Sequence, residues 1–270
     1  MRLSKESTMQ QIYNATKIIA DAYASQMINA SDEVATWAIH KLKHSFGVAH
    51  DIMDILYHEK DIFNSFSLEQ RKLTEIAAIL HDLGRFYQHR DGHHISNSEY
   101  DHGVEAAKLL EKIPEFNNPI LLFAIAEHNH FSINYQNPYY LQLSNDDKKL
   151  AELIAKLLRD ADKLENIRRL IYHHNNQIGT RQQGKLSTKV KEDILSCKCV
   201  EHQNISTAID LMAANISWIN DIYFASTLRI IDELGFVPLC LQLAQEQKAD
   251  DEDIDFLQKH FNIKDIVLAK

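Results

Sequence analysis

The sequence predicts an all-α protein. Apolar residues recur at helical spacing in nearly every segment, and no stretch alternates apolar and polar residues as a half-buried strand would. Seven Gly and four Pro in 270 residues leave few interruptions, so long helices are expected. A chain of 270 residues can form one large domain or two small ones, and we expect a single all-α domain over residues 1–270.

Helices in the first half of the chain are expected at about residues 7–29, 31–59, 67–82 and from 98 onward. The first carries an apolar stripe, and the second begins at acidic residues that suit the positive end of a helix dipole. A capping box at Ser67–Gln70 opens the third, and Gly84 would let the chain leave that helix after His81-Asp82. A polar loop at about 86–97 should separate the third helix from the fourth.

Helices in the second half are expected at about residues 119–128, 144–174, 188–196, 204–234 and from 250 onward. Asn118 caps the first of these, with Pro119 at its first position. Residues 129–143 are rich in Asn and Tyr and should form a loop. Gly235 and Pro238 should end the fourth helix, and acidic residues open the last one.

Charge and composition exclude several classes of protein. The formal net charge of −9 gives no broad basic surface for duplex nucleic acid, although a local basic pocket for phosphate is compatible with it. Three sparse cysteines, Cys197, Cys199 and Cys240, favour reduced thiols. The N-terminus lacks the apolar core of a signal peptide, and no apolar run approaches the ~20 residues of a membrane span. We therefore expect a cytoplasmic protein that binds neither duplex nucleic acid nor a membrane.

The most informative motif is His81-Asp82, which follows the apolar run 76–80. An imidazole and a carboxylate that are adjacent at a helix end can both reach one metal ion. The dipeptide alone often arises by chance, but here further candidate ligands accompany it along the chain. The accompanying residues are His44 upstream, and His102, His128 and an Asp in the segment 159–164 downstream.

That order of residues resembles the HD-domain superfamily of metal-dependent phosphohydrolases. The local contexts match as well as the order: Lys43-His44-Ser45, Ile79-Leu80-His81-Asp82-Leu83-Gly84-Arg85-Phe86, Asp101-His102-Gly103, Glu127-His128-Asn129 and Arg159-Asp160-Ala161-Asp162-Lys163-Leu164. The resemblance implies an HD-domain helical bundle with additional C-terminal helices. Its HD core would cover about residues 36–172, and the C-terminal helical extension about 188–270.

The resemblance also implies a ligand set for divalent transition metal. The first ion would be held by His44, His81, Asp82 and Asp162, and the second by His102, His128 and the shared Asp82. Asp160 and Asp162 diverge by about 200° on a helix, so they cannot both face one site. They lie on opposite flanks of the apolar stripe, so periodicity does not choose between them, and the family pattern selects Asp162. His40 and His50 are weaker rivals of His44. Fe, Mn or Ni suits such ligands better, while Mg and Zn stay open.

The implied activity is that of a phosphoric ester hydrolase. Its substrate would be a nucleotide or another small phosphate ester, and its nucleophile metal-bound hydroxide, because a metal ion lowers the pKa of bound water from ~15.7 towards ~7. The catalytic residues would be Asp82 and Arg85, with Arg85 holding the phosphate. Further substrate contacts are expected from Arg159, Lys163 and Asn166.

Three points stay open. The chain could instead be a non-catalytic metal-binding regulatory or scaffold protein that has kept the ligands without turnover. Stringent-response hydrolases carry an acidic pair soon after the HD dipeptide, and this chain has Leu83-Gly84-Arg85-Phe86 there, so the substrate is not identified. The C-terminal helices could form a homodimer interface, a lid or an extended core.

Overall fold

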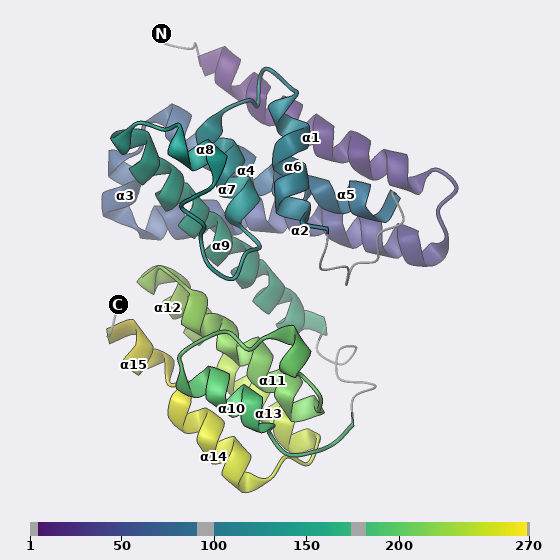
Figure 1. Ribbon diagram of the computed structural model, residues 1–270, viewed down its shortest axis with the longest axis vertical. Helices are drawn as coiled ribbons and strands as arrows, with labels where there is room; N and C mark the ends of the chain where they lie inside the picture. Colours follow the sequence, from purple (N-terminus) through teal and green to yellow (C-terminus); the bar gives the residue numbers. More distant parts are fainter. Residues whose placement is uncertain (1–4, 91–99, 174–181, 269–270) are drawn as a thin grey trace. The chain divides into compact units, whose positions relative to one another are not determined.

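The computed structural model describes residues 5–90, 100–173 and 182–268. These residues form helices and no strand, apart from an isolated bridge between Gln182 and Thr207, so the predicted all-α class is confirmed (Figure 1). The chain divides into two compact units, residues 1–162 and 163–270. Compact units are not by themselves separate domains, and the single domain stays a prediction. All six predicted metal ligands belong to the first unit.

The first unit is built from α1 (Lys5–Met27), α2 (Asp32–His58), α3 (Lys60–Ser65), α4 (Leu68–Leu80), α5 (Leu83–Arg90), α6 (His102–Glu111), α7 (Pro119–Glu127), α8 (Pro138–Leu141) and the first part of α9 (Asn145–His173). Helix α4 packs against α1 and α2, and α6 packs against α5 and α7. Every residue of α7 from Ile120 to Glu127 is buried. A helix that is apolar on all sides belongs in a core, and α7 is the central helix of this unit.

The predicted helix starts of α2, α4 and α7 are confirmed by their caps. The Ser31 hydroxyl accepts the Val34 amide at the start of α2. At α4 both halves of the capping box between Ser67 and Gln70 are present. The Asn118 side chain accepts amides of the first turn of α7, and Pro119 takes the first helical position, where its missing N–H has no helical partner to lose.

The predicted loop at 86–97 is wrong for residues 86–90, because α5 begins directly after His81-Asp82. The remainder of that loop, 91–97, lies outside the described residues. Gly84 is inside α5 and does not end α4. A Cβ added to Gly84 would lie 2.1 Å from the His102 carbonyl oxygen, so glycine is needed here for the close crossing of α5 and α6.

Helix α6 begins later than predicted. Ser98 lies outside the described residues, while Asp101 is the N-cap and accepts the Gly103 and Val104 amides at 3.0 Å. A Cβ on Gly103 would lie 2.8 Å from the Ile125 carbonyl oxygen. Gly84 and Gly103 together allow the backbone of α6 to approach both of its neighbours.

The second unit contains the end of α9, α10 (Thr188–Leu195), η2 (His202–Asn204), α11 (Ala208–Ser217), η3 (Trp218–Asp221), α12 (Ala225–Glu233), α13 (Phe236–Glu246), α14 (Asp251–His260) and α15 (Ile263–Leu268). Helix α13 packs against α11 and α14, and α12 packs against α15. The predicted long helix 204–234 is wrong: the chain forms α11, a short 3-10 turn and α12 instead.

Local polar side chains explain that break. The Ser217 hydroxyl donates to the Ala214 carbonyl at 2.7 Å and accepts the Val200 amide at 2.8 Å, which replaces helical pairing at the end of α11. Gly235 adopts φ 67° and ends α12 as predicted. Pro238 lies in the first turn of α13, where proline is tolerated, and therefore does not end a helix.

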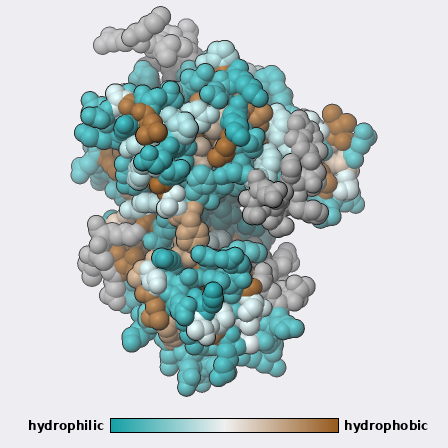
Figure 2. Space-filling model, viewed as in Figure 1, coloured by the Kyte–Doolittle hydropathy of each residue, from teal (hydrophilic) through white to brown (hydrophobic). Residues whose placement is uncertain are grey.

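The surface seen in Figure 2 is largely hydrophilic, with apolar side chains in small groups. Isolated apolar side chains such as Tyr13 and Tyr172 are exposed, which is ordinary for a globular surface. Among the described helices, none has a stretch long and apolar enough to cross a membrane.

Candidate metal centre

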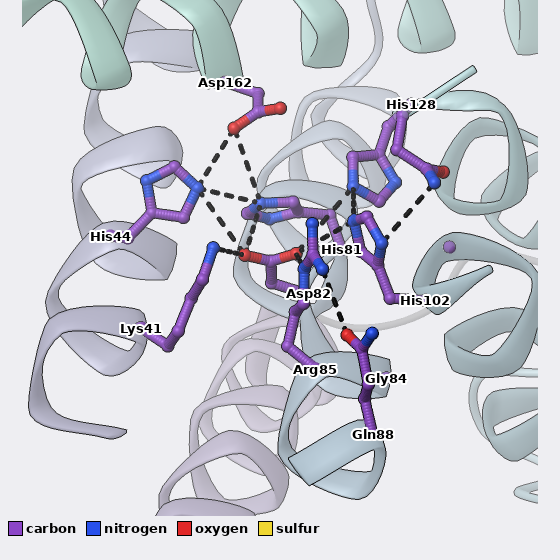
Figure 3. A network of polar contacts seen from close by, with 12 residues as sticks. Lys41, His44, His81, Asp82, Gly84, Arg85, Gln88, His102, His128 and Asp162 are labelled. Carbon is purple, nitrogen blue, oxygen red and sulfur yellow. Dashed lines mark hydrogen bonds and ion pairs between the residues drawn. The ribbon is translucent and has the colours of Figure 1, made fainter. Parts of the chain in front are cut away.

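Four histidines surround the carboxylate of Asp82 in the first unit (Figure 3). They come from α2, from the turn between α4 and α5, from the first residue of α6 and from the C-cap of α7. Relative exposures are 1% for His44, 0% for His81, 6% for His102 and 3% for His128. A cluster this buried needs partners for its polar atoms.

His44 and His81, the first histidine pair, converge with two carboxylates. Their Nε2 atoms lie 3.4 Å apart, and each is 3.7 Å from Asp82 Oδ2. Asp162 Oδ1 lies 3.0 Å from His44 Nε2 and 4.0 Å from His81 Nε2. His44, His81 and Asp162 are close enough together to hold one ion, with Asp82 Oδ2 beside both histidines, and Asp162 is the acid beside His44. His40 stays 6.2 Å from His44 between ring centroids, and His50 is exposed.

His102 and His128, the second histidine pair, face the other oxygen of Asp82. Their Nε2 atoms lie 3.2 Å apart, at 3.3 Å and 3.9 Å from Asp82 Oδ1. One carboxylate thus presents a separate oxygen to each pair. His81 also lies close to the second histidine pair, since the centroid of its ring is 4.9 Å from that of the His128 ring.

Helix ends set the orientation of two of these rings. His81 Nδ1 donates to the Ala78 carbonyl at 2.7 Å, and His128 Nδ1 donates to the Ile125 carbonyl at 2.6 Å. Both carbonyls belong to the last turns of α4 and α7, where helical partners run out. With the proton on Nδ1, each Nε2 carries a lone pair directed at the centre, as a metal ligand requires.

The charge state of the cluster also suits a cation. Burial lowers the pKa values of His81 and His102, and lowers that of His128 to about 4. Burial acts to raise the pKa of Asp82, but Lys41 and the histidines hold it well below its usual range. At neutral pH the rings of His81, His102 and His128 are therefore neutral and Asp82 is ionised, which is the state that binds metal.

Two cations flank Asp82. Lys41 Nζ lies 2.7 Å from Oδ2, and Arg85 Nε lies 3.7 Å from Oδ1 (Figure 3). Gln88 holds Arg85 in position, because the Arg85 guanidinium donates to Gln88 Oε1 at 3.0 Å. Arg85 was predicted for this site, whereas Lys41 and Gln88 were missed. Lys41 precedes His44 by three positions, so the helical spacing placed it on the same face of α2.

Asp101 and Glu127 are next in sequence to His102 and His128, but the imidazole that both acids bind is that of His130. Asp101 and Glu127 both bind His130: its Nδ1 lies 2.8 Å from Glu127 Oε2 and its Nε2 lies 2.5 Å from Asp101 Oδ2. Hydrogen bonds to both acids raise the pKa of His130 to about 10. The charged His130 ties the N-terminus of α6 to the end of α7, and sequence reasoning missed it.

Arg159, which was predicted to contact the substrate, binds main-chain carbonyls. It is 1% exposed, and its guanidinium donates to the carbonyls of Glu127, His128 and His130 at 2.9, 3.3 and 2.5 Å. We assign it to holding this segment of backbone, because those carbonyls would otherwise be buried without donors. Its predicted substrate contact stays a prediction.

Lys163 and Asn166 belong to the second unit. Lys163 Nζ lies 2.7 Å from Asp221 Oδ2, and Asn166 Oδ1 accepts from Arg169 at 3.2 Å. Their predicted role in substrate binding stays a prediction.

Comparison with known proteins agrees with this geometry. Residues 42–167 match the family model described as the HD domain. No curated protein and no solved structure matches the chain. The matched stretch, less than half of the chain, is similar to the HD domain, which is typical of metal-dependent hydrolases. It includes the four histidines, Asp82 and Asp162, and Lys41 lies just outside it. The His and Asp groups could hold a divalent metal ion.

Proposed function

We propose that this protein is a phosphohydrolase that acts on a nucleotide or another small phosphate ester and uses two divalent ions, with Fe, Mn or Ni favoured. The observation that carries the proposal is the position of Asp82, whose two oxygens face two separate histidine pairs. A carboxylate shared in this way suits a pair of ions that act on one phosphoryl group. Nitrogen and carboxylate ligands are compatible with several first-row metals.

The bound ions would supply the hydrolytic nucleophile by lowering the pKa of a coordinated water. The new bond joins the water oxygen to phosphorus, the bond from phosphorus to the ester oxygen breaks, and the released alcohol takes up a proton. Charge on the phosphoryl oxygens grows during this change and needs donors nearby. Arg85 is in place for that role, because its planar guanidinium can offer two parallel N–H groups to two oxygens.

The experiment combines a substrate screen with one variant. The full-length protein is loaded with Mn²⁺, Fe²⁺, Ni²⁺ or Mg²⁺ and assayed against nucleotides, cyclic nucleotides and sugar phosphates. Arg85→Ala should lower kcat/KM by about 10²-fold while metal content stays constant, and Arg85→Lys should recover part of the loss. The exposed Arg229 provides the matched control, and Arg229→Ala should change neither quantity.

Two outcomes would count against parts of the proposal. If every phosphoester stays at the level of the metal-stripped control with all four metals, the protein is better described as a metal-binding regulatory or scaffold protein. Normal turnover in Arg85→Ala would keep the hydrolase and remove Arg85 from the phosphate site.

A further inference from the structure

Lys41 is a largely buried cation at the metal centre. Its side chain is 17% exposed, and Nζ lies 2.7 Å from Asp82 Oδ2, the oxygen that faces His44 and His81. Figure 3 shows Lys41 approaching Asp82 from the side of His44, whereas Arg85 stands on the side of His102. The shared carboxylate thus has one cation on each side.

A lysine at this position is costly if its only partner is Asp82. Under the proposed function, Asp82 Oδ2 would be a metal ligand, and an ammonium group beside it would repel the incoming ion. Removing the lysine would then improve metal binding. The positive charge has a use only if an anion joins the site together with the metal.

The balance of charge indicates which anion that is. Two divalent ions carry four positive charges, Lys41 and Arg85 add two, and the carboxylates of Asp82 and Asp162 remove two. A hydroxide nucleophile removes one more, so three positive charges remain for the substrate. A terminal phosphate group is a dianion near neutral pH, whereas a phosphodiester carries one negative charge. The dianion comes closer to neutralising the site.

We infer that Lys41 binds the phosphoryl group opposite Arg85, and that the substrate is a phosphomonoester. This inference rests on the proposed function. An ammonium group has three donors on a flexible stem. One N–H can stay with Asp82 Oδ2 while another donates to a phosphoryl oxygen, so Lys41 need not leave the carboxylate when the substrate binds.

The test measures binding of inorganic phosphate to the Mn²⁺-loaded, full-length protein by calorimetry. Lys41→Met, which keeps the length of the side chain without its charge, should raise the Kd for phosphate by about tenfold to hundredfold. Its Mn²⁺ content should match or exceed that of the wild type. Lys43 lies two residues away on α2 with an exposed side chain, so Lys43→Met is the matched control and should change neither quantity.

Two further variants guard against a purely structural effect. Lys41→Arg keeps the charge and should recover part of the phosphate affinity. Lys41→Gln keeps a hydrogen-bond donor for Asp82 without charge and should behave like Lys41→Met. If both neutral variants bind phosphate as tightly as the wild type while the wild type hydrolyses phosphoesters, the inference about Lys41 is overturned and the proposed function stands.

Hydrolysis and phosphate binding by the wild type distinguish the remaining outcomes. Hydrolysis of diesters or cyclic nucleotides without hydrolysis of monoesters would overturn the substrate class. A Mn²⁺-loaded wild type that neither binds phosphate nor hydrolyses any phosphoester would overturn the proposed function, and the role of Lys41 with it.

Discussion

The two histidine pairs share one carboxylate but differ in what else surrounds them. The first pair, His44 and His81, has Asp162 as a second acid. In the described part of the chain, the second pair, His102 and His128, has only Asp82 within 4.0 Å as an acid. Four protein atoms therefore face the first position, against three for the second.

This difference predicts different tasks for the two positions. Four protein ligands, two of them anionic, would hold an ion firmly and leave little room for exchange. Three protein ligands would leave coordination positions for water and substrate, which is the usual arrangement at catalytic metals. We therefore expect a tight ion at the first histidine pair and a weaker, more exchangeable ion at the second.

The largest effect should follow from removing what the two positions share. Asp82→Ala deletes an oxygen from each, so we expect Mn²⁺ content to fall from about two ions per chain to near zero. Elemental analysis after desalting measures this. The control is Asp54→Ala, which removes a carboxylate of α2 that pairs with His58 away from the centre. A folded Asp82→Ala protein with normal metal content would refute the shared carboxylate.

The next effect should separate the two positions. Titration of metal-free wild type with Mn²⁺ should give a tight and a weak phase. His128→Ala should keep the tight phase, and His44→Ala should keep only the weak one, since each removes a ligand from one pair. His40→Ala changes a histidine one turn from His44 on α2 and should preserve both phases. A single phase lost equally in both variants would show that the pairs hold one ion.

The sequence predicted which residues gather around Asp82 because these residues are tied to local motifs. His81 and Asp82 are adjacent, and Gly84 and Gly103 lie within three residues of ligands, so local order and composition carried the information. Lys41 could have been predicted in the same way, since it lies one helical turn before His44.

Other features depend on contacts between distant segments, and no local pattern shows them. His130 binds Asp101 across 29 residues of sequence, and Arg159 donates to a carbonyl 32 residues away. The break after α11 has the same origin, because the Ser217 hydroxyl is used by the Val200 amide. Periodicity alone favoured a continuous helix there, and tertiary pairing overrode it.

A smaller effect is expected from a change at His130, which supports only the second histidine pair. His130→Phe removes the link between Asp101 and Glu127, so the second histidine pair should be less well positioned. Loss of such a supporting contact typically weakens metal binding by ~10-fold to 100-fold, and we expect the lower value in the weak Mn²⁺ phase. The tight phase should not move. His50→Phe alters an exposed histidine and is the control; equal weakening of both phases would indicate general destabilisation.

The smallest effect should come from Gln88, which supports one of the two cations beside Asp82. Lys41 contacts Asp82 directly, whereas Arg85 is 3.7 Å away and is held by the buried Gln88. Gln88→Leu removes that support, and the loss of about 1 kcal/mol for one hydrogen bond should lower kcat/KM by about fivefold. Both Mn²⁺ phases should be unchanged, because Gln88 supports a substrate contact and no ligand. Gln88→Glu should lower kcat/KM further, since a carboxylate would compete with phosphate for Arg85. If Gln88→Leu instead weakened a metal phase, Arg85 would act through Asp82, and the separation between ligands and cations would be wrong.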